Sequence, residues 1–200
     1  MIHRWALVFV AALLLTACGA TEESTLPVAG VTEIAGPYQT EPYRAFDQAL
    51  VQKLEDECAA PVADGRLELV LADGRGGGRV LLVYGGPDNT SGECVASIDA
   101  NGAVLVEGSG TASSSGADLP GALEVRPRSG GSSSGPGAYG YLSGVAGSDI
   151  GRVVIELADG TAITASTGGG NFAAWWPGEA QPKRVLGYDA GGNEVANEPY

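Results

Sequence analysis

Hydrophobic residues recur with a period of two over much of the chain. Leu67, Leu69 and Leu71 alternate with other residues, and further Val- and Leu-rich runs follow at 79–86 and 93–108. Alternation is typical of β-strands, whose successive side chains point to opposite faces. Asp-Gly and Asn-Gly pairs next to these runs are hairpin-type turn signals. The pattern predicts a mainly β protein, built as small antiparallel sheets or a sandwich.

One stretch, residues 43–58, has a helical period instead. Its apolar residues recur at every fourth position: Phe46, Leu50, Leu54 and Cys58. Such spacing gives a helix one apolar face. Pro42 fits a helix start and Pro61 a stop. We therefore expect a single N-terminal helix with Cys58 on its buried side.

The remaining segments suggest how the chain is organised. Residues 108–137 are rich in Gly and Ser, which is typical of a linker or long loop, with one strand expected near 123–125. The sequence "LELVLADG" at 67–74 is echoed by "VVIELADG" at 153–160. One sequence does not decide between a duplication and a shared hairpin pattern. The predicted organisation is a signal peptide at 1–17, a flexible tether at 18–40, a helix plus β subdomain at 41–107, the linker at 108–137 and a β subdomain at 138–200.

The N-terminus has the pattern of an export signal. A basic start is followed by an apolar run at 5–15, which is too short to span a bilayer and has the length of a signal-peptide core. The run ends in Leu15-Thr16-Ala17-Cys18. This motif resembles the lipobox of bacterial lipoproteins. The resemblance implies a diacylglyceryl group on the Cys18 thiol, removal of the preceding peptide, and a mature chain anchored to the cell membrane and facing outside the cytoplasm. The alternative is an ordinary secretory signal with an incidental cysteine.

Two cysteines remain once Cys18 is set aside, Cys58 and Cys94. An even remainder in an exported protein indicates one disulfide, which persists in an oxidising compartment. Such a disulfide would link the helix covalently to a strand. Two buried free thiols are the alternative. A zinc site needs more ligands than these two cysteines, because the mature chain has no histidine to add.

Composition excludes several classes of function. The single histidine, His3, lies in the expected signal peptide, so histidine-based catalysis and metal binding are excluded for the mature chain. The net charge of −13 disfavours nucleic acid as a partner. No cofactor and no metal are expected.

Glycine-rich and acidic turns supply weak candidates for chemistry. The segment "DGRGGGR" at 73–79 lacks the spacing of a phosphate loop and is interpreted as a strand connection. The segments at 97–102 and 188–194 place oxygens as a cation loop would, but a hairpin turn explains each of them. Paired carboxylates could hydrolyse glycosides without histidine. The acids close to the tryptophans in sequence are Asp149, Glu156, Asp159, Glu179 and Asp189, and nothing singles out a pair.

The C-terminal segment contains adjacent tryptophans in "NFAAWWPG". With a period of two, Phe172, Ala174 and Trp176 share the face expected to be the core. Trp176 is therefore predicted to be buried, and Trp175 is left as a weak ligand-binding candidate. Together with "LADG" and "YDAGG", the segment 139–200 resembles uncharacterised exported proteins of high-GC Gram-positive bacteria. That resemblance implies an exported domain and no activity.

The sequence thus predicts a membrane-anchored extracytoplasmic lipoprotein that is not an enzyme. Its β domain is expected to bind a protein or glycan partner of the cell envelope. Two alternatives stay open, a carboxylate-dependent hydrolase of the envelope and an accessory domain with no ligand.

Overall fold

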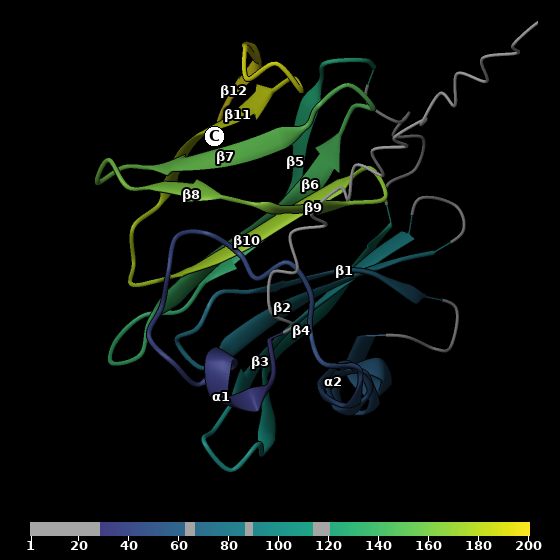
Figure 1. Cartoon of the computed structure of the whole chain (residues 1–200), viewed down its shortest axis with the longest axis vertical. Coiled ribbons are helices and arrows are strands. Elements are labelled where there is room, and N and C mark those ends of the chain that lie inside the picture. Colours follow the sequence, from purple (N-terminus) through teal and green to yellow (C-terminus); the bar gives the residue numbers. More distant parts are fainter. Residues whose placement is uncertain (1–28, 63–66, 87–89, 114–120) are drawn as a thin grey trace, which may run out of the picture.

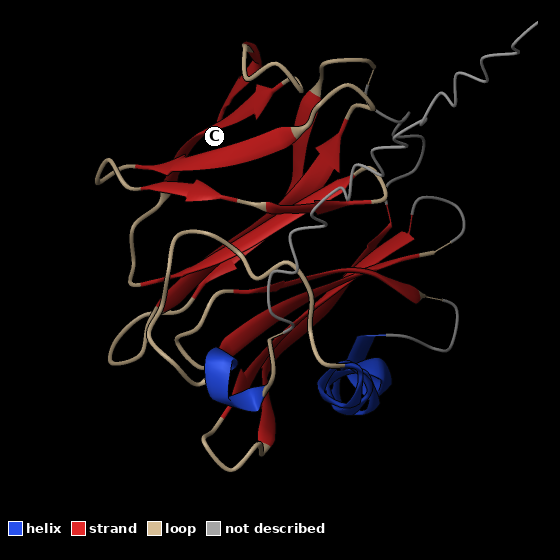
Figure 2. Ribbon diagram, in the orientation of Figure 1, coloured by secondary structure: helices blue, strands red, loops and turns tan. Residues whose placement is uncertain are grey.

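The computed structural model describes residues 29–62, 67–86, 90–113 and 121–200, and the fold over these ranges is mainly β. Short antiparallel strands account for most of it, with two helices at one end (Figure 2). The predicted β class is therefore confirmed. The strands form three four-stranded sheets, here named sheet I, sheet II and sheet III.

Sheet I is a simple meander. Its strands lie in the order of the sequence, each paired antiparallel with the next. They are β1 (Glu68–Gly74), β2 (Arg79–Gly85), β3 (Thr90–Ile98) and β4 (Val104–Ser113). This hairpin arrangement follows from the turn signals and the alternation seen in the sequence.

The other two sheets interleave segments of the C-terminal half. Sheet II has the order β5 (Val125–Ser132), β6 (Tyr139–Ala146), β10 (Asn171–Pro177) and β9 (Ser166–Gly168). Sheet III has the order β12 (Glu194–Pro199), β11 (Pro182–Tyr188), β7 (Arg152–Leu157) and β8 (Ala162–Thr164). The chain leaves sheet II after β6, builds β7 and β8, and returns through β9 and β10. Sheets II and III are therefore one interwoven unit.

The sheets stack in layers (Figure 1). Apolar cores lie between the helices and sheet I and between adjacent sheets. On β2, Val80, Leu82 and Tyr84 face the helices, whereas Leu81 and Val83 face sheet II. A third core fills the space between sheets II and III. Because sheets I and II are covered on both faces, the central strands β2 and β10 carry apolar residues on both of their faces.

The main helix begins later than the sequence predicts. Helix α2 (Gln48–Val62) starts after Asp47, whose Oδ1 accepts hydrogen bonds from the backbone N–H groups of Ala49 and Leu50. An aspartate at this position satisfies N–H groups that lack a partner within the helix. Pro42 does not start the helix, and Pro61 lies within its last turn. Leu50, Leu54 and Cys58 are buried as predicted, whereas Phe46, expected on the same face, precedes the helix and is partly buried.

The predicted disulfide is present between Cys58 and Cys94, with the Cα atoms 5.9 Å apart. It joins α2 to β3 in the core beneath sheet I. Helix and sheet are thus linked covalently, as expected from the apolar face of the helix.

The predicted tether at 18–40 is wrong for residues 29–40. Ala29 and Ile34 are buried, and Ile34 is the last residue of a short helix, α1 (Val31–Ile34). This segment is fixed by hydrogen bonds to the β1–β2 connection, including one from the Gln39 N–H to the Arg75 carbonyl. Its apolar residues do not recur with a regular period, because most of the segment is irregular and packs against the backbone of a loop. Residues 18–28 lie outside the described residues.

The predicted linker at 108–137 is wrong as well, where it is described. Strand β4 continues to Ser113, and β5 occupies 125–132. Both are edge strands, so Gly and Ser are tolerated there without an interruption of the core. At Gly131 a small residue is required, because a Cβ would lie 2.7 Å from the Tyr141 ring.

Neither helix in the described ranges is long and apolar enough to cross a membrane.

Candidate functional site

A glutamate carboxylate lies in the layer between sheets I and II. Glu93 is on β3, and the alternation of that strand places it on the same side as Val95, toward sheet II. Its side chain is 9 % exposed. Buried glutamates are rare unless they are paired, so this residue needs an explanation.

Two serine hydroxyls from sheet II reach this carboxylate. Ser129 on β5 and Ser143 on β6 each donate a hydrogen bond to Glu93 Oε1, and their own oxygens are 3.2 Å apart. A bulge in β5 brings this about, because the register shifts between Pro127 and Ser129 and so sets Ser129 opposite Ser143. Bulges commonly redirect a side chain in this way.

The carboxylate borders a cavity of about 200 Å³. Both sheets contribute to its walls, through β3 and β4 on one side and β5 and β6 on the other. The lining residues are Ser91, Gly92, Glu93, Gly110, Thr111, Ser129 and Tyr141. Thr111 is exposed and lies on the edge strand β4, at the outer margin of the cavity. We name this cavity the Glu93 pocket.

The Glu93 pocket carries a negative charge without a fixed counterion. None of the ion pairs formed among the described residues includes Glu93. The pKa of Tyr141 is raised, first by burial and then by the nearby Glu93 carboxylate. Burying a charge without a partner is costly, and two hydroxyl donors offset only part of that cost. The pocket is therefore suited to a ligand that donates hydrogen bonds.

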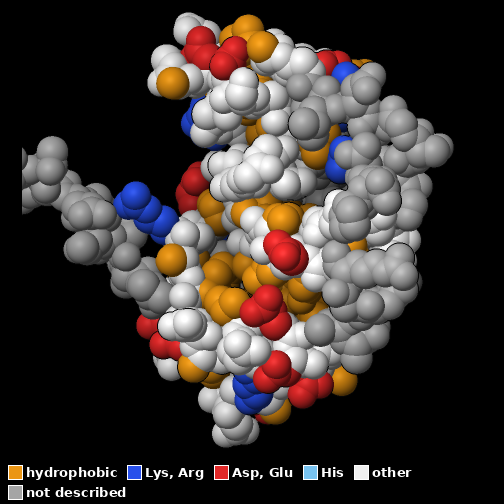
Figure 3. All heavy atoms as spheres, turned by 90° about the vertical axis from the view of Figure 1, so that its right-hand side faces the viewer, with side chains coloured by type: hydrophobic (Ala, Val, Ile, Leu, Met, Phe, Trp, Pro, Cys, Tyr) orange, Lys and Arg blue, Asp and Glu red, His pale blue; other side chains and the backbone are white. Residues whose placement is uncertain are grey.

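The protein as a whole is acidic. Figure 3 shows the face on the right of Figure 1, where acidic and some basic side chains lie among hydrophobic ones. This agrees with the net charge of −13. A protein of this charge concentrates cations near its surface.

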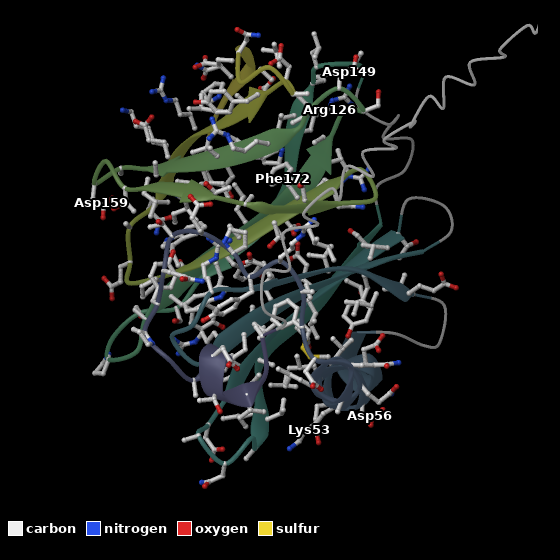
Figure 4. The ribbon with its side chains drawn as sticks, viewed as in Figure 1. Lys53, Asp56, Arg126, Asp149, Asp159 and Phe172 are labelled. Carbon is white, nitrogen blue, oxygen red and sulfur yellow. A yellow bond between two sulfur atoms is a disulfide. The ribbon has the colours of Figure 1, made fainter. Side chains whose placement is uncertain are left out.

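The carboxylates considered for hydrolysis are mostly far apart. Figure 4 shows Asp149 and Asp159 on opposite sides of the upper part of the molecule. Glu156 pairs with Lys183 and Arg184, with closest N–O distances of 3.0 and 2.6 Å, and these partners lower its pKa. Its role is thus explained by the ion pairs.

The remaining acids cap turns. Asp159 accepts from the Thr161 N–H, Glu179 from the Gly135 N–H, and Asp189 from Asn193. Only Asp149 and Asp189 are brought together, at a shallow cavity beside two turns. Hydrogen bonds from Asn193 lower the pKa of Asp189, so this carboxylate serves its own turn.

The two candidate cation loops are hairpin turns, as interpreted from the sequence. Asp99 accepts hydrogen bonds from the N–H groups of Asn101 and Ala103, and these bonds lower its pKa. No group of three or more metal-ligating side chains occurs in the part of the chain that the structure describes.

The glycine-rich stretch at 73–79 joins β1 to β2, which confirms the strand connection. Its glycines pack against other parts of the protein, since a Cβ would lie 2.0 Å from the Pro37 carbonyl oxygen at Gly76 and 2.7 Å from the Trp175 ring at Gly77. Asp73 and Arg75 form an ion pair with both side chains at 0 % exposure. The loop is filled by the protein itself and leaves no space for a phosphate.

The proposed ligand role of Trp175 is wrong. Its side chain is fully buried between sheets I and II, with the Tyr38 ring edge-on at a centroid distance of 5.2 Å. The two-face assignment itself is right, because Trp176 is buried in the other core, where its Nε1 donates to the Ala180 carbonyl. The error arose because sheet I covers the second face of β10, which the local sequence does not reveal.

Sequence reasoning missed Glu93. The available signal was the single charged residue Glu93 directly before the run "CVASI" at 94–98, in which apolar residues occur on both faces of the strand. The lipidation candidate Cys18 lies outside the described residues.

No protein-family model matches the chain, and no curated protein or solved structure is significantly similar to it. Function must therefore be inferred from the residues and their arrangement.

Proposed function

We propose that the protein is a membrane-anchored lipoprotein facing outside the cytoplasm, whose β domain binds an envelope ligand through the Glu93 pocket without catalysing a reaction. The observation that carries the binding role is Glu93 itself, a carboxylate at 9 % exposure beside an open cavity and without a cationic partner among the described residues. A core that served packing alone would place an apolar residue there.

The anchor rests on the N-terminal sequence. The motif that ends in Cys18 follows an apolar run of signal-peptide length, and acylation by more than one chain gives stable membrane attachment. The Cys58–Cys94 disulfide supports an extracytoplasmic location, because such bonds persist in oxidising compartments.

The interactions of the candidate catalytic carboxylates favour binding over hydrolysis. Glu156 is held by two basic side chains, and Asp159 and Asp189 accept hydrogen bonds within their own turns. The lowered pKa values of these three groups keep them ionised and suit them poorly as general acids.

Intact mass spectrometry of protein from the membrane fraction tests the anchor. We expect a mature chain that begins at a diacylated Cys18 and partitions into detergent. The Cys18→Ser variant should lose the modification. An unmodified, freely soluble mature chain in the wild type would refute this part of the proposal.

Binding is tested on arrays of defined envelope glycans and peptides. Thr111→Trp places a large side chain at the margin of the pocket, and Leu105→Trp puts the same side chain on β4 at a site that is 66 % exposed and outside the pocket. We expect wild type and Leu105→Trp to bind the same array members and Thr111→Trp to lose them. Equal binding by all three proteins, or none by the wild type, would refute the binding role.

A further inference from the structure

We infer that the Glu93 pocket recognises a primary ammonium group. This rests on the proposed binding function and specifies its ligand. The shared chemistry is an alkylammonium, presented either by a free amine or by a lysine-type side chain of an envelope peptide.

Only one oxygen of the Glu93 carboxylate accepts hydrogen bonds from the described residues. Ser129 and Ser143 both donate to Oε1 of Glu93, and no other described residue donates to either oxygen. Oε2 is therefore left to accept a hydrogen bond from whatever enters the cavity. A ligand that can only accept hydrogen bonds gains nothing there.

The other walls of the pocket carry further hydrogen-bond acceptors. Ser91, Thr111 and Tyr141 line the same cavity and carry hydroxyl groups. A hydroxyl oxygen can accept a hydrogen bond, and an ammonium group offers three donors in a compact head. One carboxylate oxygen together with surrounding hydroxyls thus supplies the acceptors that such a head needs.

The charge of the ligand distinguishes an ammonium group from a neutral alcohol. Both donate hydrogen bonds, but only the ammonium neutralises a carboxylate that is buried without a counterion. Both ligands donate to an ionised acceptor, but only the ammonium adds the attraction between opposite charges, which is strong at a desolvated site. The net charge of −13 also raises the concentration of cations near the protein. The selectivity should therefore favour the cation.

The size of the cavity limits what enters. A volume of about 200 Å³ is below that of typical drug-sized sites, so the pocket accommodates a head group and the first part of its chain. The rest of the ligand would lie outside, near the exposed Thr111.

The experiment is a titration of the mature protein, followed by NMR or calorimetry, with n-butylamine, N-acetyl-lysine methylamide and 1-butanol. We expect both amines to bind about tenfold or more tightly than the alcohol. Tighter binding of the lysine derivative indicates a peptide ligand, and equal binding indicates a free amine. Equal affinities for amines and alcohol would overturn the inference.

Two variants make the assignment specific. Glu93→Gln should weaken amine binding about tenfold or more. Glu68→Gln, the same change at an exposed position on β1, should leave binding unchanged. If both variants lose affinity equally, attraction by the overall charge explains the binding and the inference fails. Thermal unfolding of each variant shows whether it is folded, and Thr111→Trp provides a second test that leaves Glu93 intact.

The two proposals can fail separately. If array ligands bind the wild type and are lost in Thr111→Trp, but amines show no preference, only the ammonium assignment is refuted. If neither array ligands nor amines bind, the proposed binding function is refuted together with it.

Discussion

The carboxylate of Asp73 on β1 accepts a hydrogen bond of 3.0 Å from the backbone N–H of Trp175 on β10, 102 residues further along the chain. The same carboxylate accepts from the Ser166 hydroxyl on β9 and pairs with Arg75. Arg75 in turn donates to the Thr40 carbonyl at 2.6 Å. This buried polar cluster connects sheet I, sheet II and the N-terminal segment.

Substitution of Asp73 should destabilise the protein severely. In Asp73→Asn the charge of Arg75 loses its partner while both groups remain buried, a change that costs about 3–5 kcal/mol. That is a large part of the stability of a typical domain. Urea unfolding measured by fluorescence would show the loss.

The chain supplies a matched control in Asp159→Asn. Asp159 lies in a second Leu-Ala-Asp-Gly sequence, but it is exposed and accepts only within its turn. We expect a much smaller loss there, because water replaces the missing interaction. Similar losses in both variants would show that the cluster around Asp73 does not hold the sheets together.

These two tetrapeptides show how far the sequence predicts the fold. The alternation and the turn residues predict strands and hairpins, and both Leu-Ala-Asp-Gly segments do end a strand. The sequence does not show that Asp73 is fully buried and Asp159 exposed, because this depends on which sheet covers each turn. The strand expected near 123–125 proved to be β5, which runs on to Ser132, and its extent was missed for a related reason, since its glycines reflect contact with Tyr141.

The candidate site was less predictable than the fold. Glu93 becomes notable only when sheet II covers its strand and the β5 bulge brings Ser129 to it. These contacts join positions 36 and 50 residues apart. By contrast, the pairing of Cys58 with Cys94 could be predicted, because only two cysteines remained outside the N-terminal motif.

Both adjacent tryptophans should be important for stability. Trp175 fills the core between sheets I and II, and Trp176 the core between sheets II and III, with exposures of 0 % and 2 %. Either alanine substitution should cost about 3–5 kcal/mol, as expected for a large side chain removed from a core. Chemical denaturation of the two variants measures this. A loss below about 1 kcal/mol for Trp175→Ala, the typical effect of a surface change, would contradict its burial.

Tryptophan fluorescence provides an independent check on the same point. Acrylamide should quench the emission of Trp175 and Trp176 poorly in the folded protein and strongly after unfolding. Measuring the Trp175→Phe and Trp176→Phe variants separates the two contributions. Efficient quenching of Trp175 in the folded state would show that its side chain is exposed to solvent and would contradict its burial.

Removal of the disulfide should destabilise the domain without changing its fold. The bridge closes a loop with a sequence separation of 36. In the chain-entropy model a loop of this length contributes about 3–4 kcal/mol. The double variant Cys58→Ala, Cys94→Ala should show that loss in thermal or urea unfolding. Non-reducing peptide mapping of the wild type should find the 58–94 crosslink, and free thiols at both sites would contradict it.

The buried Tyr84 predicts a loss of stability in alkali. Burial, and then the negative charge of Glu55, raise its pKa from 10.0 to about 12. Below pH 10 the folded and unfolded states both keep the proton, so the contribution of Tyr84 to stability is complete. Between pH 10 and 12 the unfolded state ionises first, and the stability therefore falls as the pH rises. Urea midpoints measured across this range should show the decline.

Tyr84→Phe isolates the contribution of this residue. Its hydroxyl has no hydrogen-bond partner among the described residues, so the variant should keep its stability at pH 7 and lose less of it between pH 10 and 12. Part of the decline should remain, because burial also raises the pKa of Tyr38 and Tyr139. Glu55→Gln should fall between wild type and Tyr84→Phe, since it removes the smaller cause of the shift. An alkaline profile identical to the wild type in Tyr84→Phe would mean that Tyr84 ionises equally in both states.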